Sequence, residues 1–383
     1  MTVPAAEDLM FVRRVPAERL SPPITRVGAV GWLRANLFSS IRSGILTILL
    51  AVLAIWIANH VIHFLIIDAV WTGADREACL PRDGQAVGAC WAFIHERLPF
   101  FIYGSYPAAA RWRVDVFFVL LAMSGGWMLW LDAPRRGIGA VVFFIVLPLV
   151  SFILLSGWPL IGLPTVATDL WGGMLVTVVV AVVGIVVSLP AGIVLALGRR
   201  SDMPAVRFLS IIFIEFVRGV PLITVLFMAS VMLPLFVPPE FSPDKLLRAL
   251  VGMVIFASAY QAEVVRAGLE GIPRGQFEAG GALGLGYWKL HSFVVLPQAL
   301  RITIPNIVNS FIALFKDTSL VFFVGIFDFL KTIEIARLDP KWAGPNISIT
   351  GYAFAGIVYF VFCYLMASYA AGVERRLERS DRR

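Results

Sequence analysis

Charged residues are scarce in this chain of 383 residues: Asp, Glu, Lys and Arg make up 15%, whereas apolar residues make up 59%. A soluble globular domain has about 25% charged residues. Long apolar runs take their place, and about 20 apolar residues suffice to cross about 30 Å of hydrocarbon as a helix. The composition therefore excludes an ordinary soluble domain and predicts an all-α polytopic membrane protein.

Residue types that carry catalysis and metal binding are also few, with three cysteines and four histidines. His60 and His63 share a helical face, but no further ligands lie nearby, so we expect no metal site. The nucleotide-binding pattern GxxxxGK[ST] does not occur, and no Ser/His/Asp or Cys/His set stands out. We therefore expect no enzyme, no catalytic residues and no cofactor in this chain, and any ATP to be hydrolysed by a partner.

Eight apolar segments are long enough to span a membrane. They run roughly over residues 44–67, 114–131, 138–155, 173–197, 208–236, 246–265, 302–327 and 352–371. The first 42 residues are polar and carry arginines without an apolar core of their own. We therefore expect no cleavable signal peptide and a cytoplasmic N-terminus.

The distribution of Lys and Arg predicts the orientation, because cationic loops resist translocation. With the N-terminus inside, the cytoplasmic segments hold twice as many Lys and Arg residues as the outside segments. This asymmetry predicts that both termini are cytoplasmic and that the polar segment after residue 266 is cytoplasmic too. The net charge of +7 needs no nucleic acid to explain it.

The pattern divides the chain into a cytoplasmic arm at 1–42, three spans within 43–172, and five spans with the charged motifs within 173–383. An outside loop at about 68–112 contains Cys79 and Cys90. In an oxidising compartment these two cysteines can form a disulfide that closes a small loop. Cys363 lies within a span, where we expect an inert packed thiol.

A Gly-punctuated polar segment at 278–297 reads EAGGALGLGYWKLHSFVVLP. It resembles the EAA signature of ABC importer permeases, the short helical loop through which an ATPase subunit acts on the permease. The resemblance implies ATPase coupling by Glu278, Ala279, Gly280, Gly284, Leu296 and Pro297, within a cytoplasmic loop at about 267–301. The departures are Gly280, where Ala is usual, and Val294, where Ile is common. Because Gly lowers helix propensity by about 1 kcal/mol relative to Ala, we expect a looser first turn.

Residues 173–375 carry further motifs in the same order, including IEFVRGVPLITVLF, AYQAEVVRAGLEGIP and LFKDTSL. They resemble the permease of a polar-amino-acid ABC importer, and the extra N-terminal spans resemble the longer permease subunit of a general L-amino acid importer. The resemblance implies a type I importer fold with a core of five helices in the bacterial inner membrane. The implied partners are a second permease subunit, two cytoplasmic ATPases that use ATP and Mg²⁺, and a periplasmic amino-acid-binding protein.

Ionisable residues inside spans are informative, because each costs about 2.5–3.5 kcal/mol on insertion scales unless it is paired or hydrated. Lys316 and Asp317 are helix neighbours near the middle of the seventh predicted span, followed by Thr318 and Ser319. Two interpretations remain open: one charge points into a substrate pathway with the hydroxyls beside it, or both pair with other spans and lock the bundle.

Two Glu/Arg pairs stand three residues apart, at 215 and 218 and at 263 and 266, so each pair can meet on its own helix. A local ion pair is favoured for Glu263 and Arg266. Glu215 and Arg218 are candidates to line the pathway, because Pro221 can break the helix beside them.

The sequence thus predicts a permease subunit that takes up L-amino acids by alternating access. A rival hypothesis is an ATP-independent channel or ion-coupled carrier in which Lys316, Asp317 and Glu215 relay protons or ions. The EAA-like loop separates the two, because an ion-coupled carrier has no use for an ATPase docking site. A structural scaffold is disfavoured by the number of buried charges.

Overall fold

The computed structural model describes residues 28–81, 87–130 and 132–381. Within these ranges the chain is helical without a β-strand, which confirms the predicted all-α fold. The chain divides into two compact units, Met1–Ala69 and Val70–Arg383. Most of the arm predicted at 1–42 lies outside the described residues.

The first unit contains α1 (Gly28–Asn36) and α2 (Ile41–Ile62), and α2 continues as a π-helix through His63–Ile67. The Ser40 hydroxyl caps α2 by accepting a hydrogen bond from the backbone N–H of Ser43. Residues Ile41–Ile67 form one apolar helix of 27 residues, long enough to cross a membrane, as predicted for the first span.

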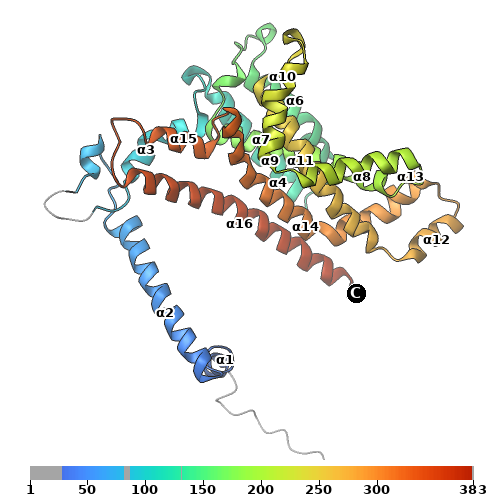
Figure 1. Cartoon of the computed structure of the whole chain (residues 1–383), viewed down its shortest axis with the longest axis horizontal. Helices are drawn as coiled ribbons and strands as arrows, with labels where there is room; N and C mark the ends of the chain where they lie inside the picture. Colours follow the sequence, from blue (N-terminus) through green and yellow to red (C-terminus); the bar gives the residue numbers. More distant parts are fainter. Residues whose placement is uncertain (1–27, 82–86, 131, 382–383) are drawn as a thin grey trace, which may run out of the picture. The chain divides into compact units, whose positions relative to one another are not determined.

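The second unit holds the remaining helices, labelled in Figure 1 where room allows. They are α3 (Trp91–Tyr103), α4 (Trp112–Leu129), α5 (Arg136–Val141), α6 (Leu147–Ser156), α7 (Gly173–Arg199), α8 (Pro204–Gly219), α9 (Leu222–Phe227), α10 (Leu233–Phe236), α11 (Lys245–Glu270), α12 (Arg274–Ala282), α13 (Tyr287–Leu290), α14 (Leu296–Asp317), α15 (Phe329–Ala336) and α16 (Ile347–Asp381).

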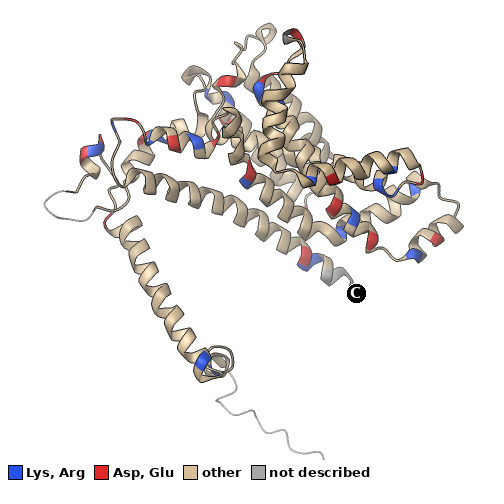
Figure 2. Ribbon diagram, viewed as in Figure 1, with Lys and Arg blue, Asp and Glu red and all other residues tan. Residues whose placement is uncertain are grey.

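π-helical turns join three pairs of these helices into longer ones. They connect α5 to α6 (Val142–Val146), α9 to α10 (Met228–Met232) and α13 to α14 (His291–Val295). Among the described residues of both units, seven helices are long and apolar enough to span a membrane, and one bent helix pair raises the number to eight. Figure 2 shows α16 almost free of charge until its C-terminal end.

The predicted fifth span, residues 208–236, is not one straight helix. It is bent by 106° between α8 and the segment Leu222–Phe236. Pro221 has no N–H to donate, and proline disfavours helical geometry in the residue before it. Val220 accordingly adopts extended φ and ψ angles of −109° and 136°. The break expected beside Arg218 is therefore present, and it is sharp enough to separate two helices.

The hydrophobic core of the second unit is centred on α7 and α11. Leu175 and Val180 of α7 belong to the same buried cluster as Met253 of α11 and Leu314 of α14. Phe117 of α4 also belongs to this cluster. α4 and α6 pack with the core helices, and the division between compact units falls after Ala69; the boundary between extra helices and permease core expected after residue 172 stays a prediction.

Within the loop expected at 68–112, the described residues from Val70 onward are folded and pack within the second unit. Cys79 and Cys90 form a disulfide, and both are buried with Phe93 of α3 and Trp342 in one apolar cluster. Ion pairs join this segment to the connection between α15 and α16, through Arg97 with Asp339 and Lys341 with Glu96. The Lys341 ammonium beside Glu96 lowers the pKa of that carboxyl. Figure 1 shows α3 and α15 at the end of this unit opposite α12 and α13.

Candidate functional site

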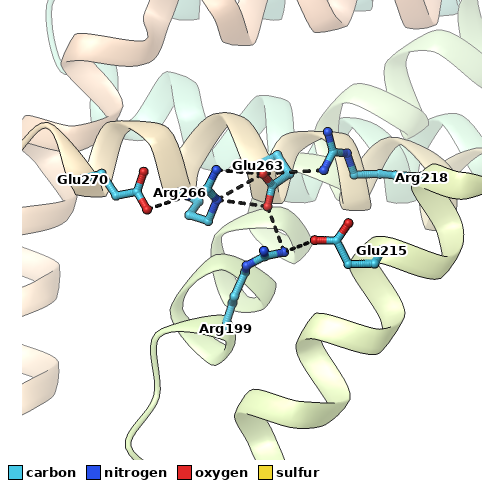
Figure 3. Close-up of polar contacts among 6 residues, drawn as sticks. All are labelled: Arg199, Glu215, Arg218, Glu263, Arg266 and Glu270. Atoms are coloured by element: carbon cyan, nitrogen blue, oxygen red, sulfur yellow. Dashed lines mark hydrogen bonds and ion pairs between the residues drawn. The ribbon is translucent and has the colours of Figure 1, made fainter.

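Six charged side chains from three helices form a continuous network (Figure 3). Arg199 lies at the end of α7, Glu215 and Arg218 lie on α8, and α11 supplies the rest, Glu263, Arg266 and Glu270. The network lies where the polar face of α8 meets α11. It ties the helix before the 106° bend to two helices of the core.

Glu263 is the centre of the network. Its carboxylate lies 3.2 Å from a guanidinium nitrogen of Arg199, 3.5 Å from one of Arg218 and 3.0 Å from one of Arg266. The Glu263 side chain is only 16% exposed. Three cations around one carboxylate satisfy it in a partly buried position, where an unpaired charge is costly.

The sequence favoured a local ion pair for Glu263 and Arg266 and made Glu215 and Arg218 candidates to line the pathway. Glu263 and Arg266 form the expected local ion pair. Glu215 instead pairs with Arg199 at 2.7 Å, and Arg218 pairs with Glu263. The spacing of Glu215 and Arg218 allowed a contact along one helix, but partners on α7 and α11 compete for both side chains. Arg199 was missed because it follows the predicted span and its carboxylate partners, Glu215 and Glu263, lie on other helices.

A cavity of about 220 Å³ lies between α11 and α14. Asp317 is the carboxylate in its wall, and Gln261, Tyr260 and Ser310 also line it. Gln261 is 1% exposed, and its Oε1 atom has no hydrogen-bond partner among the described residues. A buried acceptor without a donor is uncommon in native proteins. The cavity thus combines a carboxylate and an unused acceptor in a mostly apolar surrounding.

The KDTS motif does not act as one unit. Asp317 is the last residue of α14, not the middle of a span as expected, and a 3₁₀ helix follows over Thr318–Val324. Lys316 is exposed. Thr318 is fully buried and donates to the carbonyl of Phe315, while Ser319 donates to the carbonyl of Lys316. Of these four residues, Asp317 is the one in the cavity wall.

Arg218 and Glu215 do not line this cavity. The Arg218 guanidinium lies 5.6 Å from the centre of the Tyr260 ring, and Tyr260 does line it. Arg218 therefore connects the charged network to the cavity through one aromatic ring. Helical spacing could have revealed the other wall residues, because Ser310, Ala313 and Leu314 precede Asp317 by seven, four and three positions on one face of α14.

The segment between α11 and α14 contains the short helices α12 and α13, and the resemblance to the EAA signature predicts such a helical loop. α12 begins at Arg274, so Glu278 and Ala279 lie in its second turn and are exposed. Glu278 lines a hollow of about 450 Å³ together with Arg200 and Arg274. Leu283, Trp288 and Phe293 expose 79%, 72% and 79% of their surface. This loop presents charge and apolar side chains together, as a protein-binding surface does.

Gly280 and Gly284 in this loop meet different structural requirements. Gly284 has a φ of +71°, in the left-handed region that glycine adopts at low cost, and it follows the end of α12. Gly280 is buried, and a Cβ there would lie 2.3 Å from Cδ1 of Leu290. The expected loosening of the helix at Gly280 is not seen, because α12 is helical through it. Gly280 instead lets Leu290 pack closely.

Leu296 and Pro297 lie at the start of α14 and not in a loop. Pro297 has no N–H to donate, and the π-helical turn His291–Val295 lies just before it in the same continuous helix. Through α13 and the π-helical turn, the helix extends from Tyr287 to Val324. The predicted seventh span, 302–327, is thus the second part of a helix that begins in the motif itself.

Comparisons with known proteins agree with these features. Residues 188–379 match the family described as binding-protein-dependent transport system inner membrane component. The chain is 48% identical to the inner membrane amino-acid ABC transporter permease protein YhdY of Escherichia coli (strain K12), over 91% of this chain and 93% of that protein. It is 38% identical to the glutamate/glutamine/aspartate/asparagine transport system permease protein BztC of Rhodobacter capsulatus, over 98% of this chain and 100% of that protein.

A crystal structure of an amino acid ABC transporter with histidines aligns with 53% of this chain and 92% of its own, at 24% identity and a TM-score of 0.46. The family match covers half of the chain, and the two relatives match it nearly end to end. The chain belongs to the family of binding-protein-dependent transport system inner membrane components.

Proposed function

We propose that this chain is the transmembrane permease subunit of an ATP-driven importer of L-amino acids. The family, and two amino-acid transporter permeases that match this chain over nearly their whole length, support this function. Its partners are a second permease subunit, two cytoplasmic ATPases that bind ATP and Mg²⁺, and a periplasmic amino-acid-binding protein. Both termini and the α12–α13 loop are cytoplasmic, in line with the excess of Lys and Arg on that side.

The observation that carries the proposal is the exposed helical loop between two spans. An ATPase subunit binds Glu278 and Ala279 of α12 and the apolar side chains Leu283 and Trp288. Because α11 precedes this loop and α14 follows it, movement of the loop acts on both walls of the Asp317 cavity. ATP binding and product release then drive alternating access, with substrate delivered at the end where α3 and α15 lie.

The cavity of Asp317 lies on the substrate pathway. A zwitterionic amino acid carries an ammonium group. The Asp317 carboxylate and the unused Oε1 of Gln261 can both accept hydrogen bonds from it. The side chains of Lys316, Thr318 and Ser319 do not line the cavity. Lys316 is exposed, and the hydroxyls of Thr318 and Ser319 donate to backbone carbonyls at the end of α14. Glu215 and Arg218 act outside the cavity, through the network that supports Tyr260.

The loop assignment is tested by Glu278→Lys, which reverses charge on the ATPase-binding face. With the partner subunits co-expressed, we expect normal membrane insertion but at least a tenfold loss of ATP-dependent uptake. Glu374→Lys is a matched control, because Glu374 is an exposed glutamate near the end of α16; it should keep normal uptake. Normal uptake and normal ATPase stimulation in Glu278→Lys would contradict the assignment.

A further inference from the structure

A second cavity, of about 520 Å³, lies between the extra helices and the core. Its wall is mostly apolar, with Phe117 of α4, Phe152 of α6, Val182 and Val183 of α7 and Leu250 of α11. Its volume is in the range of roughly 300–1,000 Å³ typical of ligand pockets. It is separate from the Asp317 cavity, whose wall residues are different.

Three polar atoms in this wall lack a hydrogen-bond partner within the part of the chain that the structure describes. They are Oγ of Ser151, Oγ of Ser156 and Nε1 of Trp171. Trp171 is 6% and Ser151 8% exposed, so water does not readily replace the missing partner. The indole N–H can only donate, and each hydroxyl can donate as well. A ligand that satisfies them must carry oxygen acceptors.

Two of these polar groups, those of Ser156 and Trp171, lie at one end of the cavity. Ser156 is the last residue of α6, and Trp171 follows the short 3₁₀ helix Thr168–Leu170. At the same end the Thr168 hydroxyl donates to Asp244, which also caps α11 by accepting from the N–H of Leu247. Asp244 forms no ion pair with the described Lys and Arg side chains. The cavity thus has an apolar body and an end with donors and one negative charge.

This arrangement fits an amphipathic molecule with a cationic head, ester or phosphate oxygens beneath it and a hydrocarbon chain. We propose that the cavity binds one molecule of phosphatidylethanolamine between the extra helices and the transport core. One of its two acyl chains contacts Phe117 and Val183, its oxygens accept hydrogen bonds from Trp171 and Ser156, and its ammonium faces Asp244. In the proposed orientation the lipid belongs to the outer leaflet, and it joins α4 and α6 to α7 and α11.

Native mass spectrometry of the full chain, purified with its co-expressed partners in mild detergent, tests the lipid site. The probes are added phosphatidylethanolamine and phosphatidylglycerol. Val183→Trp fills the cavity, and Trp171→Phe removes the donor while keeping the bulk. Val187→Trp is the matched control, because Val187 lies one helical turn further along α7 and is 43% exposed. We expect the wild type and Val187→Trp to retain one phosphatidylethanolamine.

Val183→Trp should lower the bound fraction at least tenfold, and Trp171→Phe should lower it several-fold. Equal lipid retention in all four proteins would overturn the proposal, because it indicates adventitious lipid on the general surface. Equal binding of phosphatidylglycerol would overturn the role of Asp244. If Val183→Trp is not monodisperse, Trp171→Phe decides: unchanged retention in this variant overturns the site.

Discussion

At the scale of single residues, Glu263 joins α7, α8 and α11 through its ion pairs. It contacts three arginines from three helices, and its side chain is 16% exposed. Glu270 contacts Arg266 alone and has a side chain that is 58% exposed. Exposed ion pairs contribute about 0–1 kcal/mol, whereas hydrogen bonds to a charged partner in less exposed positions contribute about 1.5–3 kcal/mol.

Glu263→Gln should therefore destabilise the protein by about 1.5–3 kcal/mol. The change leaves Arg199, Arg218 and Arg266 close together without their shared carboxylate. Glu270→Gln, the matched control, should cost less than about 1 kcal/mol. The measurement is the midpoint of thermal unfolding in detergent. Equal shifts in the two variants would show that Glu263 is not the centre of the network.

Asp317→Asn tests the substrate pathway. The change keeps the shape of the side chain but removes the charge that attracts an ammonium group. We expect a well-folded protein whose transition-state free energy for uptake is raised by at least about 1.5 kcal/mol, roughly tenfold in kcat/KM. Folded yield should be measured alongside uptake. A poorly assembled variant would indicate a structural role in locking the bundle, and unchanged uptake of every amino acid tested would contradict both interpretations.

At the scale of elements, α15 depends on one buried carboxylate at its start. Asp328 is fully buried and accepts hydrogen bonds from the N–H groups of Leu330 and Lys331. The Thr177 hydroxyl of α7 accepts from the N–H of Phe329, so the start of α15 is fixed to the core. Burial raises the pKa of Asp328 from 3.8 to about 7, although both N–H donors oppose the shift, and Glu334 adds repulsion.

This raised pKa predicts a pH dependence. The folded protein holds the proton to a higher pH than the unfolded chain, so the stabilising contribution is complete below pH 3.8 and is lost as pH rises toward 7. At about 1.4 kcal/mol per unit of pKa, the loss is up to about 4 kcal/mol. The midpoint temperature of thermal unfolding of the wild type should fall from pH 5 to pH 7.5, and this fall should be smaller in Asp328→Asn. An equal decline in both proteins would exclude Asp328 as its source.

The elements show what the sequence can and cannot predict. Hydropathy located every spanning segment, because apolar length is a property of each segment alone. Hydropathy alone did not predict the 106° bend between α8 and α9, since the apolar run continues through Val220 and Pro221; the proline itself indicated a break there, but not its angle. Local spacing found the ion pair of Glu263 and Arg266 but not Arg199 with Glu215, because partners on different helices depend on packing.

At the scale of the whole molecule, the motif at 278–297 was recognisable from sequence, but the bounds of the helices that contain it were not. The structure begins α12 at Arg274, four residues before the motif, and makes the second half of the motif the start of the helix Tyr287–Val324. The candidate site was predictable only in part: Asp317 stands out as a charge within an apolar run, whereas Gln261 and Tyr260 do not stand out on α11. Their role depends on which faces of α11 and α14 meet.

The central claim is that this permease is driven by ATP and not by an ion gradient. The most direct measurement is amino acid uptake into proteoliposomes that contain this chain with its co-expressed partners and enclose Mg-ATP, with binding protein outside. We expect uptake that requires enclosed ATP, persists with a protonophore and is lost in Glu278→Lys. Uptake that proceeds without ATP and follows an imposed proton or sodium gradient would contradict it.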